Sequence, residues 1–129
     1  MQSHRELRLG WVVRDVSIIF ILTFLGGLVV RIASGGLRQA PEQVQLATAA
    51  SNFFFGIVGF TIAGCLASAN RWRHLRAVAV GAWFAGLVNV AFFGVSFLRW
   101  LGGILVILVI MSVGGAISFV FKRDSRPSP

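Results

Sequence analysis

The sequence predicts an all-α, polytopic integral membrane protein with four transmembrane helices in an antiparallel bundle. Three observations support this prediction. Of the 129 residues, 57% are hydrophobic; the mean hydropathy is +0.83; and the apolar residues lie in four long runs separated by short polar or basic segments. A soluble domain of this length could not bury so much apolar surface, so the runs indicate a bilayer. We expect a single membrane domain over residues 1–129.

The first apolar run is long enough to cross the membrane only if the helix includes a charged residue. Its uncharged core, Val16–Val30, has 15 residues and would extend roughly 22 Å as a helix, whereas crossing the hydrocarbon takes about 20 residues. We therefore expect a helix over about residues 12–34, with Arg31 in its last turn. A basic segment precedes the run, as in a signal peptide. The run is too long for one and three more spans follow, so we expect a retained helix.

The other three runs, Leu46–Ala69, Ala77–Leu98 and Trp100–Phe121, contain no charged residue. We expect helices over about 46–69, 77–98 and 100–121. Between the first two spans, glycines are expected to stop one helix and Pro41 to begin the next. Residues 70–76 are expected to form a short basic loop. Almost no loop remains between the last two spans, which are therefore expected to form a tight hairpin.

The distribution of basic residues predicts the orientation. With four spans, nine Lys and Arg residues fall on the side of the two termini and three on the opposite side. This bias places both termini, the 70–76 loop and the 122–129 tail in the cytoplasm, and we expect a bacterial cytoplasmic (inner) membrane. The net charge of +8 then reflects topology and anionic lipid headgroups, so we expect no nucleic acid partner. Candidate contacts with lipid or a partner are Arg71, Arg73, Arg76, Lys122 and Arg123.

Small residues recur at helical spacing on the last three predicted helices. Burial alone does not drive helices together in lipid, but close backbone approach at small residues does. These faces either hold one bundle together or contact another chain, and four short helices have few faces to spare. We therefore expect at least one face to contact other membrane subunits or a second copy. The candidate packing residues are Gly59, Ala63, Ala67, Gly81, Ala85, Gly103, Gly114 and Gly115.

Four polar residues are expected in the outer half of the membrane: Arg31, Ser51, Asn52 and Asn89. In one hypothesis, Ser51, Asn52 or Asn89 hydrogen-bonds Arg31 in a cluster that faces protein. In the other, which we favour, Arg31 extends to the headgroups and the asparagines bond helix backbones.

The remaining reactive residues give little support for catalysis. We expect Asp15 at the inner interface, bonded to an arginine of residues 70–76 rather than to Arg14, because adjacent helical residues point about 100° apart. His74 is expected to be interfacial, and Cys65 to be a small packing residue. With no carboxylate pair, no nucleophile beside a base and no metal-ligand cluster, we expect no enzyme, no catalytic residues and no metal site.

Two functions remain open at this point. The first is a non-catalytic membrane subunit or assembly factor that packs against partner transmembrane helices in a larger complex. The alternative is a small oligomeric channel or transporter with a polar cluster in its outer half. The sequence requires no cofactor, although the four phenylalanines of Ser51–Phe60 could contact a lipid tail, a quinone or a pigment.

Overall fold

The structure is a computed structural model that describes residues 9–35, 41–67 and 70–122, and the regular secondary structure in these ranges is entirely helical. Four stretches are long and apolar enough to cross a membrane, and the third of them includes two helices. The chain is therefore a helical membrane protein with four candidate spans. The helices are α1 (Leu9–Ala33), α2 (Pro41–Leu66), α3 (Arg71–Ala85), α4 (Leu87–Phe93) and α5 (Phe97–Phe121).

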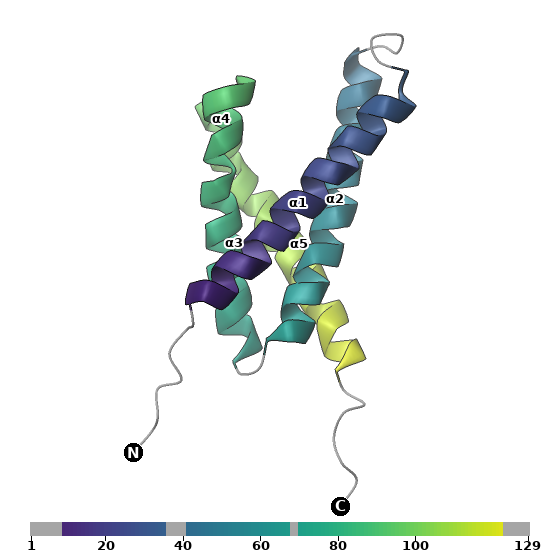
Figure 1. Cartoon of the computed structure of the whole chain (residues 1–129). Helices are drawn as coiled ribbons and strands as arrows, with labels where there is room; N and C mark the ends of the chain where they lie inside the picture. The colour runs from purple at the N-terminus through teal and green to yellow at the C-terminus, as the bar shows by residue number, and fades with distance from the viewer. Residues whose placement is uncertain (1–8, 36–40, 68–69, 123–129) are drawn as a thin grey trace, which may run out of the picture.

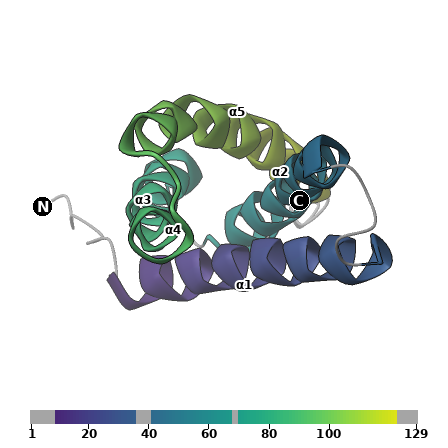
Figure 2. The same cartoon turned by 90° about the horizontal axis from the view of Figure 1, so that it is seen from above.

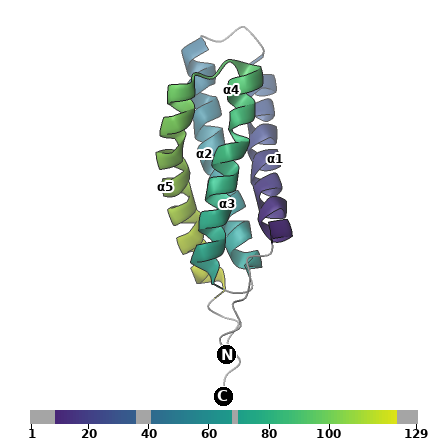
Figure 3. The same cartoon turned by 90° about the vertical axis from the view of Figure 1, so that its left-hand side faces the viewer.

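Helices α1 and α5 run diagonally through the bundle: they cross in Figure 1 and lie on opposite sides of the molecule in Figure 2. Between them stand α2 on one side and the column of α3 and α4 on the other. Both α2 and α3 pack against α1 and α5, and Figure 3 shows the spans aligned along one direction. We call one end of the bundle the basic end: there α3 begins at Arg71 and α5 ends at Phe121. The opposite end, where α2 begins at Pro41 and α5 begins at Phe97, is called the far end.

The third span begins earlier than the sequence analysis expected. Residues 71–76 belong to α3 instead of forming a loop, and Asn70 precedes the helix in the left-handed conformation (φ 44°). The reason lies in the helical period: His74 and Leu75 are buried, while Arg73 and Arg76 remain exposed. One face of this basic segment therefore packs in the bundle, and the helix starts six residues before the predicted position 77.

The same span is interrupted at Gly86, after which α4 continues to Phe93. Gly94 then adopts a φ of +67°, and the Ser96 side chain caps α5 by accepting a hydrogen bond from the Arg99 backbone N–H at 3.3 Å. Both features end and restart helices. The break between the last two spans therefore lies at 94–96, and not at residue 99 as the charge pattern suggested.

The first connection follows the expected chemistry. After α1 ends at Ala33, Gly35 has a φ of +63°, and Pro41 is the first residue of α2, the helical position that proline favours. The helix predicted over 46–69 thus runs over 41–66, because its polar first turn is also helical.

Close approach between helices is concentrated at glycines. A Cβ built on Gly59 would lie 2.7 Å from Ile19, and one on Gly81 would lie 2.8 Å from Val16. On Gly114 it would lie 2.8 Å from the Ile57 carbonyl oxygen. These contacts surround a core that lies toward the basic end. Its buried residues are Val12, Ile19, Phe60, Ala63, Leu75, Val78, Ala79, Ile110 and Met111.

Most of the candidate packing residues are used inside this one chain. Ala63 and Ala67 are buried, and Gly59, Gly81, Gly114 and Gly115 each face a neighbouring side chain or backbone. Ala85 is half-buried, whereas a Cβ on Gly103 would meet nothing within 4 Å. The small-residue faces therefore serve the internal bundle, except around Gly103.

Replacement of Gly114 by Ala should lower the free energy of unfolding by about 1–3 kcal/mol, because the new methyl group overpacks the contact between α5 and α2. SDS titration in mixed micelles, followed by circular dichroism, measures this change. Gly102→Ala is the matched control on α5, since a Cβ there meets nothing within 4 Å. Equal unfolding midpoints for the two variants would contradict the close α2–α5 contact.

Candidate functional site

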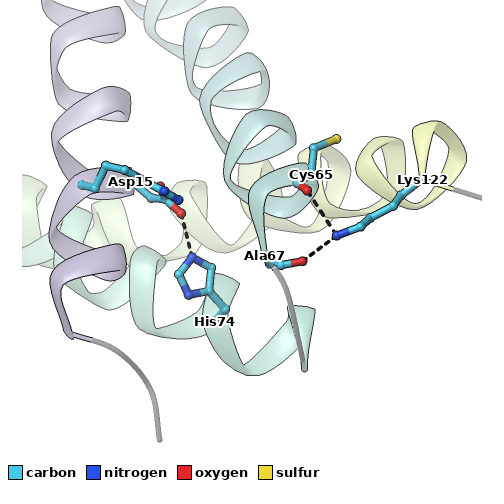
Figure 4. A network of polar contacts seen from close by, with 6 residues as sticks. Asp15, Cys65, Ala67, His74 and Lys122 are labelled. Atoms are coloured by element: carbon cyan, nitrogen blue, oxygen red, sulfur yellow. Dashed lines mark hydrogen bonds and ion pairs between the residues drawn. The ribbon is translucent and has the colours of Figure 1, made fainter. Parts of the chain in front are cut away.

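A buried carboxylate and a buried imidazole meet near the basic end. Asp15 Oδ2 lies 2.7 Å from His74 Nε2, and the two residues are 1% and 7% exposed. Figure 4 shows the side chains pointing toward one another from α1 and α3. Because Val12, Asp15 and Ile19 share the buried face of α1, the helical period itself directs the carboxylate inward. The contact joins two helices that are distant in sequence.

Asp15 also accepts a hydrogen bond from its neighbour, Arg14, whose Nε lies 2.7 Å from Oδ1. Two sequence predictions for Asp15 were therefore wrong. Its partner on the 70–76 segment is His74 and not an arginine, and Arg14 does pair with it. The backbone directions of adjacent helical residues diverge by about 100°, but the half-exposed arginine side chain is long enough to turn back. His74 is likewise buried and bonded, although the sequence indicates no partner for it.

Two other cations at the basic end have partners inside the chain. Arg71 lies 3.4 Å from Ser118 Oγ, measured from Nη1, and stands over the Phe119 ring. Lys122 Nζ donates to the carbonyl oxygens of Ala67 at 2.7 Å and Cys65 at 3.3 Å, as Figure 4 shows. Lys122 thereby satisfies carbonyls at the C-terminal end of α2, where a cation is also favoured by the helix dipole.

The other lipid-contact candidates differ in their surroundings. Arg73 and Arg76 are exposed, and neither forms an ion pair within the described ranges. They remain available for lipid headgroups. Arg123 lies outside the described residues.

The larger feature is a cavity of about 600 Å³ on the far-end side of the core, lined by all four spans. Its deep part is apolar, with Val16, Ile19, Phe60 and Ile110 among the lining residues. Along α5 the lining runs from Arg99 to Ile110, a distance of roughly 16 Å at 1.5 Å per residue. The lining thus extends along α5 over about half the hydrocarbon thickness of roughly 30 Å.

One wall of the cavity is formed by two stacked tryptophans, one from α3 and one from α5. Their ring centroids are 4.3 Å apart, with 9° between the planes. Trp83 Nε1 donates to the Trp100 carbonyl at 3.1 Å, and Trp100 Nε1 donates to the Trp83 carbonyl at 2.9 Å. Gly86, at the break between α3 and α4, lies beside this stack: a Cβ there would be 3.0 Å from the Trp83 carbonyl oxygen and 3.4 Å from Trp100 Cδ1.

The cavity brings together two of the four polar residues singled out from the sequence. Asn52 and Asn89 both line it. Ser51 instead faces α1, where a Cβ on Gly26 would lie 2.7 Å from the Ser51 hydroxyl. Arg31 is exposed, does not line the cavity, and makes no hydrogen bond with the other three. Both asparagines therefore line the cavity, whereas Arg31 does not and is not hydrogen-bonded to them.

Sequence reasoning missed Arg99, which lines the cavity together with Thr23 and the two tryptophans. Arg99 was assigned to a short loop. A signal was present, because Ser96 is a favourable N-cap and places Arg99 in the first turn of a helix. From there a stripe with helical period follows. It consists of Arg99, Gly102, Gly103, Val106, Ile107 and Ile110.

Comparisons with protein families, curated proteins and solved structures give no match for this chain. Within residues 9–35, 41–67 and 70–122, no three His, Cys, Asp or Glu side chains lie close enough together to hold a metal ion. The candidate sites are therefore the polar pair and the cavity.

Replacing either member of the polar pair by leucine should destabilise the protein by about 3 kcal/mol, because a buried partner loses its hydrogen bond. The double variant Asp15→Leu/His74→Leu should lose less than the sum of the single losses. A double-mutant cycle in mixed micelles gives this coupling, with the exposed Arg76→Leu as control. A coupling energy near zero would mean that the two side chains do not interact.

Proposed function

We propose that this chain is a non-catalytic membrane protein that binds an amphipathic molecule in the cavity between its spans, as a transporter or binding protein would. The observation behind this proposal is the cavity itself, which has an apolar deep part and polar side chains toward the far end. Its volume of about 600 Å³ falls within the usual range of ligand sites, roughly 300–1,000 Å³. A lining that extends roughly 16 Å along α5 would accommodate a hydrocarbon chain from one leaflet.

We also propose that the spans form an antiparallel bundle with the basic end in the cytoplasm of a bacterial cell. The positive-inside rule supports this orientation, since Arg14, Arg71, Arg73, Arg76 and Lys122 lie toward that end. The cavity would then open toward the outer leaflet of the cytoplasmic membrane. Anionic lipid headgroups on the cytoplasmic face would contact Arg73 and Arg76.

The residues around the cavity favour binding over catalysis. Among the described lining residues there is no His, Cys, Asp, Glu, Lys or Ser side chain, and the hydroxyl group comes from Thr23. General acid–base or nucleophilic chemistry needs a titratable group beside the reacting atoms. Asp15 and His74 could exchange a proton, but they are buried in the packed core and do not line the cavity.

A second candidate function is that of a subunit or assembly factor in a larger membrane complex. One observation favours it: Gly102 and Gly103 line the cavity, and a Cβ on either meets nothing within 4 Å. Small residues with open space are places where a helix from a partner, or from a second copy, can approach closely. In that case the cavity is an interface, and a purified complex would contain a second chain.

Filling the cavity should distinguish binding from other roles. Gly103→Leu adds a side chain into open space, so the fold should survive while affinity for an amphiphile falls about tenfold or more. The probe is a single-chain fatty acid brominated along its chain, which quenches Trp83 and Trp100 on contact. Trp11→Phe and Trp72→Phe remove the other tryptophans, and saturable quenching gives the affinity.

The matched control is Gly10→Leu, which also adds leucine at an open glycine but outside the cavity. It should bind the probe as the parent does. Unsaturable or equal quenching in all three proteins would contradict an amphiphile site. Absence of quenching together with a stable second chain in mild detergent would favour the subunit role.

A further inference from the structure

The cavity is lined by a positively charged side chain and by no negatively charged one among the described residues. Arg99 is the charged side chain among the described lining residues, and no carboxylate lines the cavity. The acidic groups described in the chain, Asp15 and Glu42, lie in the core near the basic end and in the first turn of α2. An occupant therefore meets a positive charge that no ion pair neutralises among the described residues.

The guanidinium group of Arg99 has its donors available. The Arg99 backbone N–H donates a hydrogen bond to Ser96 Oγ. The Arg99 side chain is exposed, and it forms no ion pair or hydrogen bond within the described ranges. Amide groups from two other walls line the same cavity, Asn52 from α2 and Asn89 from α4. Guanidinium and amide groups together match the oxygens of a carboxylate or phosphate, which arginine binds in bidentate fashion.

The polar and apolar parts are arranged in order along the cavity. Arg99 lies in the first turn of α5, and the lining then continues through Gly103, Val106 and Ile107 to Ile110. At Gly103 the helix presents no side chain, so a slender chain can pass close to the backbone. A molecule with its charge at Arg99 would thus lay its hydrocarbon against this stripe and reach the core.

We propose that the occupant is an anionic single-chain amphiphile, whose carboxylate or phosphate contacts Arg99, Asn52 and Asn89. This inference rests on the proposed function, and it adds the substrate class. A cationic head would face Arg99 without a compensating carboxylate. A zwitterionic head would bring its own positive charge into the same space. The lining on α5 is a single stripe from Arg99 to Ile110, which matches one hydrocarbon chain, as in a fatty acid or an anionic lysophospholipid.

The experiment compares brominated amphiphiles of equal chain length that bear a carboxylate, a phosphate or a phosphocholine head, with quenching of Trp83 and Trp100 as the readout. The anionic probes should bind the parent about tenfold more tightly than the phosphocholine probe. Arg99→Gln should remove this preference, because the affinity for the anionic probes falls to about that for the phosphocholine probe. The matched control is Arg31→Gln, which alters an exposed arginine outside the cavity and should keep the preference.

The outcomes separate the two proposals. Two results would overturn the anionic assignment while leaving an amphiphile site in place. The first is equal affinity of the parent for all three heads. The second is that Arg31→Gln loses the preference for anionic probes as fully as Arg99→Gln does. No saturable quenching by any probe would overturn the proposed function itself. Brominated phosphatidylglycerol, which has two chains, supplies the last arm. If it competes as well as the single-chain acid, the single-chain assignment is wrong.

Discussion

The architecture depends on where the helices can approach each other closely. In lipid, apolar side chains gain little by leaving the membrane for a protein interface, so contact requires small residues that admit a neighbour. Gly59, Gly81 and Gly114 provide such contacts around the core. Helices α1 and α5 cross in Figure 1, and the cavity is lined by residues of all four spans on the far-end side of the core.

The buried carboxylate and the arginine of the cavity lie in different parts of the bundle. Asp15 is enclosed with His74 and Arg14 in the packed half, where a buried carboxylate without partners would be costly. Among the described residues, every fully buried side-chain nitrogen and oxygen has a hydrogen-bond partner. The cavity, by contrast, is lined by Arg99 and by amides. Rigid packing and an accessible positive charge are therefore separated along the bundle.

The chain between α3 and α5 changes at two places, Gly86 and Gly94, near the tryptophan wall of the cavity. At Gly86 helix α3 gives way to α4, and the reciprocal hydrogen bonds of Trp83 and Trp100 hold α3 to α5. The turn at Gly94, with its positive φ, then returns the chain so that Arg99 enters the first turn of α5. If the third span continued as a straight helix through these positions, Arg99 would not lie in the first turn of α5.

The sequence by itself determined that the chain has four apolar spans, with a glycine stop after α1 and a proline start of α2. Hydropathy, span length and backbone preferences are local properties, so they can be read without knowing the neighbours. Only the tertiary structure decided that His74 meets Asp15, that Asn52 and Asn89 share a cavity without Arg31, and that Arg99 lines it. These relations depend on the rotation of each helix about its axis and on its crossing with the others. In this chain both are set by contacts such as Gly59 with Ile19 and Gly81 with Val16, between residues far apart in sequence.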